Sequence, residues 1–564
     1  MSVKLSEKQT AVQLVGADQL ELNPEKVVPQ PGPHQVLARV EAVGICFSDL
    51  KLLKQFDGHA RKHAIEQGVD PAILEQVSSY VPGEAPTVPG HEVVCTIVAV
   101  GEGVERFREG QRMLVQTDYR WLKTDASNAA FGYNFEGGMQ QYVLMDERVI
   151  VDPASGESFL IPVEEGLGSS AVALVEPWAC VESSYISEMR RAVKSGGKLL
   201  VAVEAGYAPE GVAACYDVAG RPAEVTLWSV EDEAEKALRT QEVIADKQAG
   251  SLAGLPDQGF DDIIYFGHRK DSLEALNDKL AVGGIMNVVL CGGTIGEPVS
   301  VGIGRIHYQD TRWIGTAGNN AADGYKNVPK NGEVRPGDRV LIIGGGGPMG
   351  QMHVIRMICA EQEGLEVTAT DLDDHRLEAL GEKLKPLCEA NQRPAQLVNP
   401  QKEELKGPYS HIDIIVPVGK LVTQAVELAD EGTIINIFAG IPVPTREEID
   451  LDRYVKQGCF MYGTSGSRLE DMKICLKKLI DGKLDTNHSV DAVSGMAGVI
   501  DGLRAVENRM MAGKIVVYPA LKDLPLIPLR EIEQHYPTVA EKLERGLWNP
   551  AAEAELLRAA GGNA

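Results

Sequence analysis

The chain has 564 residues, which is too many for a single hydrophobic core, so we expect several domains. Its net charge of −26 disfavours nucleic acid and anionic membrane surfaces as partners, because their phosphates would be repelled. The N-terminal residues lack the apolar core of a signal peptide, and no run of about 18 apolar residues predicts a membrane span. Nine cysteines without a CxxC pair indicate reduced thiols, so we expect a cytoplasmic protein.

The first 150 residues or so predict a compact β-barrel or sandwich. Short β-rich runs, such as residues 34–45 and 92–104, are separated by Gly and Pro, which is typical of short strands joined by turns. A polar, helix-prone insert, residues 51–86, interrupts this region, and we expect it to cover a substrate cleft. From about Ala171 the pattern becomes helical, and strands then alternate with helices, which predicts a parallel sheet with crossover helices.

This strand–helix alternation occurs twice, and the two passages can be aligned with an offset of 141 to 151 residues. The matching pairs are VKSGGKLLV with VRPGDRVLI, AEVTLWSVEDE with LEVTATDLDDH, FDDIIYF with HIDIIVP, and RIHYQDTRWIGTAG with RYVKQGCFMYGTSG. Because every match occurs in the same order, we predict two tandem doubly wound units, residues 194–318 and 334–466. A C-terminal segment, residues 467–564, follows them.

The second copy carries a dinucleotide-binding pattern, VLIIGGGGPMG. Gly345, Gly347 and Gly350 form G-x-G-x-x-G between an apolar strand and a helical run, with Pro348 and Met349 before the last glycine. Such glycines permit a tight turn and close approach of the pyrophosphate to a helix N-terminus. Asp371 ends the next strand, 21 residues later, where a carboxylate binds the ribose hydroxyls and disfavours NADP. We predict NAD here; the alternative is a glycine-rich turn beside a surface aspartate.

The first copy lacks these features. Its loop reads VAVEAGYAPEG, in which Gly206 remains but Glu204 would repel a phosphate and Pro209 has no N–H to donate. Ser229 replaces the acid at the end of the next strand. We therefore expect this copy to bind no dinucleotide and to serve packing or subunit contact; the alternative is a different ligand.

Five further motifs resemble, in order and spacing, those of the medium-chain zinc dehydrogenases. They are GICFSD (44–49), PGHE (89–92), VAVGEGVERFREGQRM (98–113), EGGMQQYV (136–143) and ALVEP (173–177). The nearest likeness is to the sorbitol and threonine dehydrogenase-like branch, which includes reductases of the sorbose 1-phosphate type, and it covers all but the first copy. The resemblance implies an α/β fold with a β-rich part: a GroES-like catalytic barrel (1–193), a degenerate Rossmann-like domain, an NAD-binding Rossmann domain and a C-terminal return.

The resemblance also implies one catalytic zinc ion. Cys46, His91 and Glu176 would ligate it and leave one position open for substrate, while Glu92 would ligate directly or through water. Asp49 would orient a ligand, and Ser48 would pass the substrate proton toward solvent. No cysteine lies between residues 112 and 138, so we expect no structural zinc.

Charged residues near these motifs leave the substrate open. Lys51 stands where many relatives carry a histidine of the proton relay, so the exit route of the proton is not assigned. Lys51, Arg120 and Lys123 either meet a phosphate or carboxylate of the substrate or belong to a solvated face.

Together these observations predict an NAD- and zinc-dependent oxidoreductase acting on a secondary alcohol of a polyol, sugar or sugar derivative. We expect a homo-oligomer, a dimer or tetramer. One alternative is an epimerase or lyase that uses tightly bound NAD for a transient oxidation without net redox change. Another is a zinc-free relative with a binding or structural role.

Overall fold

The computed structural model describes residues 6–229 and 231–561, which form two compact units. Unit 1 comprises residues 1–180, 347–352 and 467–564, and unit 2 comprises residues 181–346 and 353–466. Within the described ranges, no helix is both long and apolar enough to cross a membrane.

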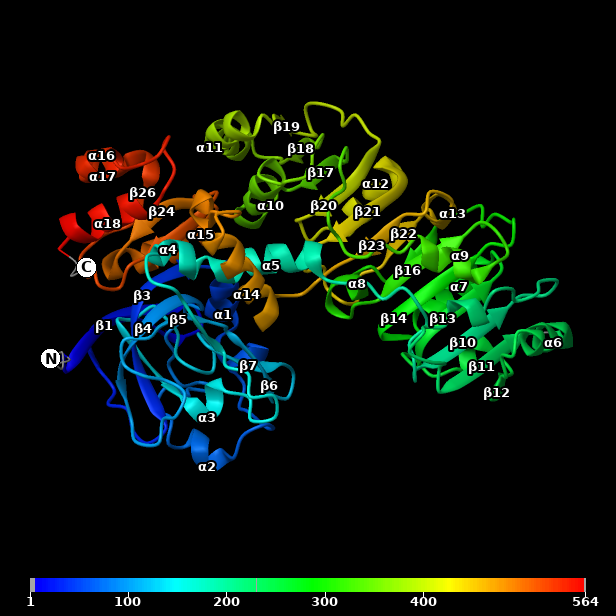
Figure 1. Cartoon of the computed structure of the whole chain (residues 1–564), viewed down its shortest axis with the longest axis horizontal. Helices are drawn as coiled ribbons and strands as arrows, with labels where there is room; N and C mark the ends of the chain where they lie inside the picture. The colour runs from blue at the N-terminus through cyan, green and yellow to red at the C-terminus, as the bar shows by residue number, and fades with distance from the viewer. Residues whose placement is uncertain (1–5, 230, 562–564) are drawn as a thin grey trace. The chain divides into compact units, whose positions relative to one another are not determined.

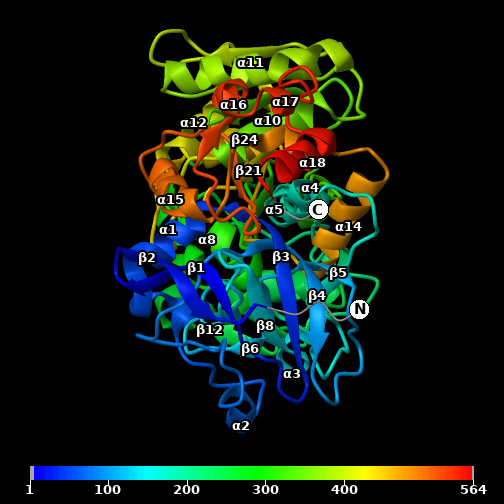
Figure 2. The same ribbon diagram turned by 90° about the vertical axis from the view of Figure 1, so that its left-hand side faces the viewer.

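Unit 1 is built on an eight-stranded, largely antiparallel sheet with the order β26-β24-β25-β3-β4-β5-β9, in which β8 also pairs with β3. Figure 2 shows β3 and β4 side by side at the centre of this sheet. Its alternating Val, Ile and Leu side chains face one apolar core, as expected for a sheet with one buried face. The strands are β3 (Gln35–Ile45), β4 (Glu92–Val100), β5 (Arg112–Val115), β8 (Tyr142–Asp146), β9 (Leu160–Pro162), β24 (Val490–Ser494), β25 (Lys514–Val517) and β26 (Ile527–Pro528). Two further pairs are β1 (Lys8–Gly16) with β2 (Gln19–Val27), and β6 (Asp118–Lys123) with β7 (Asn128–Ala130).

The segment between β3 and β4 is helical, as the composition of residues 51–86 predicts. It contains α1 (Phe47–Gln55), η1 (Phe56–Gly58), η2 (Ala60–Lys62) and α2 (Pro71–Leu74). Lys62 is fully buried, and its ammonium donates to the carbonyls of Val81 and Ala85. These bonds join the first part of the insert to its last residues, and burial lowers the pKa of Lys62 to about 8.

The C-terminal segment returns to unit 1. β25 pairs with β3, and the segment begins with the helix α14 (Leu469–Ile480). The remaining helices are α15 (Val499–Glu507), α16 (Ile532–His535), α17 (Pro537–Ala540) and α18 (Pro550–Ala559). Trp548 and Glu553 of this last stretch are buried. The Glu553 carboxylate accepts from the backbone N–H of Ser169 and Ser170, at the start of α4 (Ser169–Ala173). It therefore caps a helix more than 380 residues away in sequence.

Unit 2 contains a twelve-stranded sheet with the order β12-β11-β10-β13-β14-β16-β23-β21-β20-β17-β18-β19 (Figure 1). The first half is β10 (Lys198–Val203), β11 (Glu224–Ser229), β12 (Lys247–Ala249), β13 (Phe260–Phe266), β14 (Leu280–Val289) and β16 (Arg312–Thr316). The second is β17 (Arg339–Ile343), β18 (Glu366–Thr370), β19 (Ala395–Val398), β20 (Tyr409–Ile414), β21 (Ala429–Ile437) and β23 (Phe460–Tyr462). Strands within each half are parallel, whereas β16 and β23 pair antiparallel at Trp313 and Met461. Numbered along the chain, both halves have the order 3-2-1-4-5-6, which is that of the nucleotide-binding doubly wound fold.

The helices of unit 2 differ between its halves. The first half contains α6 (Asp232–Thr240), α7 (Lys270–Asn277), α8 (Gly304–Tyr308) and α9 (Ala321–Lys326). The second contains α10 (Pro348–Ile358), of which residues 353–358 belong to unit 2, α11 (Asp374–Asn391), α12 (Lys420–Leu428) and α13 (Leu451–Lys456). A short antiparallel pair, β15 (Val299–Val301) with β22 (Glu447–Ile449), joins equivalent positions of the halves a second time.

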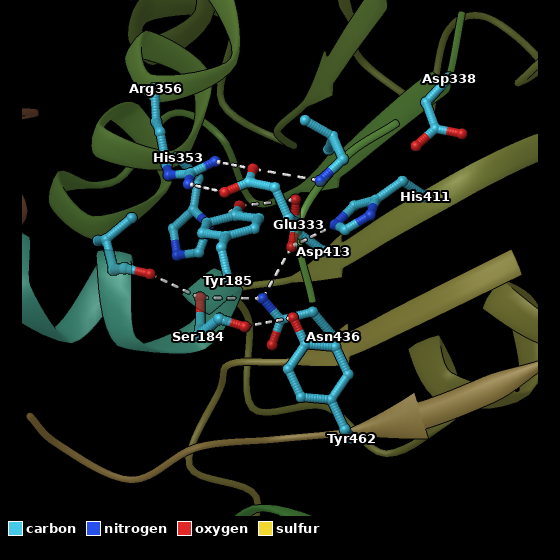
Figure 3. Close-up of polar contacts among 12 residues, drawn as sticks. Ser184, Tyr185, Glu333, Asp338, His353, Arg356, His411, Asp413, Asn436 and Tyr462 are labelled. Atoms are coloured by element: carbon cyan, nitrogen blue, oxygen red, sulfur yellow. Dashed lines mark hydrogen bonds and ion pairs between the residues drawn. The ribbon is translucent and has the colours of Figure 1, made fainter. Parts of the chain in front are cut away.

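A buried polar cluster lies in the second half (Figure 3). The Asp413 carboxylate accepts from the Tyr185 hydroxyl at 3.0 Å and from the Asn436 amide at 2.8 Å, and His353 lies 2.5 Å from the same hydroxyl. Arg356 stacks over the Tyr185 ring at 3.9 Å. Its guanidinium also pairs with two carboxylates, those of Glu182 and Glu333. This cluster fixes the last turn of α5 (Val175–Ile186) and the second half of α10 against the sheet of unit 2.

Candidate functional site

Three candidate metal ligands converge in unit 1. One ligand atom from each of Cys46, His91 and Glu92 lies within 4.8 Å of the others, and in the described part of the chain no other group of His, Cys, Asp or Glu meets that spacing. The antiparallel pairing of β3 with β4 explains the convergence. Gly44 lies opposite Glu92, so β4 begins where β3 ends. Cys46 is half-buried, whereas His91 and Glu92 are buried. A thiolate, an imidazole and a carboxylate together are a donor set that suits zinc.

Asp49 and Ser48 hold this group in place. The Asp49 carboxylate lies 3.1 Å from Nδ1 of His91 and accepts the backbone N–H of Cys46 at 2.9 Å. Nε2 of His91 therefore faces the cluster, and the Ser48 hydroxyl lies 3.1 Å from both that nitrogen and the Cys46 sulfur. Burial disfavours the charged imidazole, but the Asp49 carboxylate outweighs it and raises the pKa of His91 well above its usual value. Asp49 thus takes the orienting position that the resemblance implies for it.

Lys514 is a member of the site that the sequence did not reveal. Its ammonium pairs with one oxygen of Glu92 and donates to the carbonyl of Ile45 at 2.8 Å. The other oxygen of Glu92, Oε2, is buried without a hydrogen-bond partner. A Cβ at Gly44 would lie 1.9 Å from that oxygen, so only glycine leaves room for it. Glu92 is therefore neutralised on one side and has a free oxygen on the other, which fits a metal ligand.

Glu176 lies in the first turn of α5 and is buried. It is not among the three side chains whose ligand atoms lie within 4.8 Å of one another. Burial raises its pKa to about 7, and the charges of His91 and Glu92 act on it in opposite directions. It therefore shares the electrostatic environment of the cluster. Its role as a ligand stays a prediction.

The glycine-rich loop of the second half connects β17 to α10. Gly344 has a φ of +91°, and a Cβ at Gly345 would lie 2.9 Å from that of Ala369 in β18, so both positions require glycine. The N–H of Gly346 donates to Asp371, which directly follows β18, at 3.1 Å. Gly344 and Gly346 lie outside the G-x-G-x-x-G spacing, so the sequence did not single them out.

The other predicted cofactor residues lie where that loop enters the helix. Gly347 precedes α10, and Pro348, Met349 and Gly350 form its first turn. α10 has 11 residues, and its N-terminal N–H groups have no partner within the helix, which suits a pyrophosphate.

The corresponding loop of the first half is built differently. After β10 the chain enters a three-residue 3₁₀ turn, η3 (Ala213–Cys215), and no long helix begins there. Glu204 does not stand free at the loop: its carboxylate accepts from the hydroxyls of Tyr265 at 3.1 Å and Ser272 at 2.5 Å. The N–H of Gly206 donates to Glu231, two residues after Ser229, at 3.0 Å. The N–H of Gly346 donates to Asp371 in the same way, so this contact does not distinguish the halves; the missing helix does.

A surface cavity of about 720 Å³ lies in unit 2 between the two halves of the sheet. Its lining includes Lys326, Arg335, Lys456 and Phe460. None of the predicted site residues lines it, so we do not assign it to the reaction.

Comparison with known proteins identifies the β-rich part of unit 1: residues 32–154 match the alcohol dehydrogenase GroES-like domain. The uncharacterized protein YggP of Escherichia coli (strain K12) is 25% identical over 299 residues, which are 46% of this chain and 67% of YggP. A sorbitol dehydrogenase of Halalkalibacterium halodurans is 24% identical over 233 residues, 39% of this chain and 56% of that protein.

The crystal structure of 2R,3R-butanediol dehydrogenase from Bacillus subtilis matches 91% of this chain and 99% of its own, with a TM-score of 0.51 and 15% identity. At that identity the likeness concerns the fold. The sequence match covers little more than half of the sorbitol dehydrogenase, so activity and substrate do not follow from it.

Proposed function

Because residues 32–154 match the alcohol dehydrogenase GroES-like domain, we propose that the chain is a dehydrogenase of that family and oxidises a secondary alcohol with NAD and one zinc ion. The convergence of Cys46, His91 and Glu92 carries this proposal. A polyol, sugar or sugar derivative is the proposed substrate, in keeping with the sorbitol dehydrogenase among the relatives.

The proposed ligands are Cys46 and His91 with a carboxylate from Glu176 or Glu92. Two observations support a metal ion here: the orphaned Oε2 of Glu92, and the orientation of His91 by Asp49. Bound zinc would supply Lewis-acid chemistry that lowers the pKa of an alcohol so that it ionises near neutral pH. The ion pair with Lys514 would occupy one oxygen of Glu92 and leave the other for the metal ion. It would also offset part of the negative charge of the site.

Ser48 is the proposed proton acceptor. Its hydroxyl lies 3.1 Å from Nε2 of His91 and also bonds to the hydroxyl side chain of Tyr133. The proton of the alcohol would pass to Ser48 and onward toward solvent, while hydride leaves the carbon for the nicotinamide. Asp49 keeps the imidazole in the orientation that this geometry requires.

The second half of unit 2 is the proposed NAD domain, with Gly345, Gly347, Pro348, Met349, Gly350 and Asp371 around the cofactor. We infer that the first half is a degenerate copy of it, because the strand orders are identical and equivalent strands, β16 and β23, pair antiparallel. This pairing covers what would otherwise be an exposed sheet edge. Covering that edge is the role we propose for the copy that binds no dinucleotide. The domain layout 1–193, 194–318, 334–466 and 467–564, a cytoplasmic location and a homo-oligomer remain predictions.

Replacing Cys46 by Ser tests the proposal. We expect the purified variant to lose bound zinc, measured by plasma mass spectrometry, and its kcat/KM for NAD reduction with polyols to fall by about 10³-fold or more. NAD affinity, measured by fluorescence titration, should stay within about threefold, because the cofactor loop is unchanged. The matched control is Cys291→Ser, which alters a half-buried thiol outside the cluster.

The outcomes separate the alternatives. Less than about half an equivalent of zinc in the unaltered protein would favour a zinc-free binding role over the proposed enzyme. Purification with NAD already bound, and substrate turnover without accumulation of absorbance at 340 nm, would favour the epimerase or lyase.

A further inference from the structure

The insert between β3 and β4 brings positively charged groups toward the zinc site. The ring of Tyr133 is buried, and its centroid lies 5.7 Å from that of His91. On the same ring, the His59 imidazole lies 5.1 Å away and the Arg61 guanidinium carbon 5.6 Å away. One aromatic ring therefore separates Arg61 and His59 from a proposed zinc ligand.

Arg61 shares its nearest ion-pair partner with a second arginine. Arg61 and Arg120 share one carboxylate, that of Asp118, at 3.7 Å and 3.0 Å. The other oxygen of Asp118 accepts from the amide of Asn128 at 3.0 Å. Two guanidinium groups thus share a single carboxylate whose oxygens are both occupied. Beyond Asp118, the charge of Arg61 also acts on the carboxylate of Glu176.

The positive charges around His59 affect its pKa. Burial, followed by the charges of Arg61, Lys51 and His63, lowers the pKa of His59 to about 4, so this imidazole is neutral near pH 7. His63 itself pairs with Asp125 at 2.6 Å. The positive potential around His59 therefore arises mainly from Arg61 and Lys51.

Arg61 is suited to meet an anion. Its side chain is 30% exposed, and its contact with Asp118 is longer than a hydrogen bond, so donors of its planar guanidinium are available to solvent. Guanidinium groups bind carboxylates and phosphates through two parallel hydrogen bonds, which a lysine cannot do. Tyr133 contacts both Arg61 and His91, so an anionic group bound to Arg61 would lie close to the proposed zinc ligand.

We propose that the substrate is an anionic polyol or sugar derivative, a phosphomonoester or a carboxylate, whose charged group pairs with Arg61. This inference rests on the function proposed above. Within that function it assigns Arg61 as a specificity-determining residue. Lys51 and Arg120 add positive charge, but Lys51 is exposed and Arg120 already pairs with Asp118 and donates to the carbonyl of Ser467.

The experiment compares hexitols, the same hexitols as phosphomonoesters, and the corresponding aldonates as substrates for NAD reduction. We expect kcat/KM to be at least about 100-fold higher for one of the two anionic classes than for the neutral hexitol. In Arg61→Gln this anionic-to-neutral ratio should fall by about 30-fold or more, a range typical of losing one charge-assisted pair. The control is Arg108→Gln, an exposed arginine of unit 1 outside this cluster, in which the ratio should be kept.

A second measurement does not depend on turnover. Inorganic phosphate should inhibit competitively against the alcohol and protect the unaltered protein, but not Arg61→Gln, against thermal unfolding. Equal kcat/KM for neutral and anionic substrates, or an unchanged ratio in Arg61→Gln, would overturn the inference and leave the dehydrogenase proposal standing. Zinc-loaded protein that reduces no NAD with any of the three classes would instead overturn the proposed function.

Discussion

The two halves of the twelve-stranded sheet bury the same two polar residues but surround them differently. The fourth strand of each half carries an aspartate, Asp262 or Asp413, and the fifth carries an asparagine, Asn287 or Asn436. In both asparagines the side-chain oxygen Oδ1 is buried without a hydrogen-bond partner. The shared pair therefore belongs to the framework and says nothing about which half holds a cofactor.

The partners of the aspartates are what differ. Arg190 binds Asp262 through two hydrogen bonds of 2.7 and 2.8 Å, and burial raises the pKa of this carboxyl to about 6. Around Asp413, burial acts in the same direction, but His411 outweighs it and lowers the pKa. The second half also has α10, whose Arg356 joins the cluster, whereas no long helix follows the first strand of the first half. Equal topology thus permits different function, because the loop after the first strand decides whether a helix N-terminus is available.

The largest expected effect comes from Arg356→Met. This change removes the guanidinium that pairs with Glu182 and Glu333 and leaves buried negative charge behind. We expect the free energy of unfolding to fall by about 3–5 kcal/mol, the usual cost of breaking a buried ion pair. Urea unfolding followed by circular dichroism measures it.

The matched change in the first half is Arg190→Met. It should cost less below pH 6, because Asp262 can take up a proton when its partner is lost. Equal losses from both variants at pH 5.5 would contradict the contrast drawn between the halves.

The sequence predicted what depends on local pattern. The alternation of strands and helices, the helix α10 at the glycine-rich loop and the acid after β18 all follow from short-range spacing, although α10 begins at Pro348 and so includes Gly350. The pairs between distant residues did not follow. Lys514 meets Glu92 across 422 positions and Glu553 meets Ser169 across 384, and no periodicity signals such contacts. The partners of Glu204 could not be predicted for the same reason, because Tyr265 and Ser272 bind its carboxylate from elsewhere in the fold.

An intermediate effect is expected from exchanging the residues that end the second strand of each half. Asp371→Ser should reduce the preference for NAD over NADP by about 30-fold, since the carboxylate that repels a 2′-phosphate is lost. The reciprocal Ser229→Asp should leave both affinities unchanged, because no dinucleotide is expected in the first half. Fluorescence titration with the two cofactors measures the ratio. An unchanged ratio in Asp371→Ser would remove the assignment of the ribose site, and a gain of a second NAD site in Ser229→Asp would show that the first half is competent.

The smallest expected effect is a pH dependence that distinguishes Asp262 from its neighbour Asp261. The folded-state pKa of Asp262, about 6, lies above the ordinary value of 3.8, so the folded protein binds this proton more tightly than the unfolded chain. The stabilisation that this bound proton gives the folded protein is therefore fully present below about pH 4 and is lost as the pH rises through 6. A pKa difference of this size corresponds to about 3 kcal/mol at about 1.4 kcal/mol per unit. Relative to Asp262→Asn, we expect the unaltered protein to lose only about 1 kcal/mol between pH 4 and pH 7, because Arg190 is partly exposed and solvent screens its charge.

Asp261 provides the control with the opposite sign. Burial would raise its pKa, but the hydrogen bond from Lys194 outweighs burial and lowers it. Its contribution is present above the ordinary pKa and is lost as the pH falls, so Asp261→Asn should differ from the unaltered protein least at low pH. Thermal unfolding of the three proteins at half-unit steps from pH 4 to pH 7 resolves the two slopes. Parallel slopes would mean that Arg190 keeps Asp262 ionised throughout. Asp262 and Asp413, the equivalent aspartates of the two halves, would then differ in their partners but not in their charge.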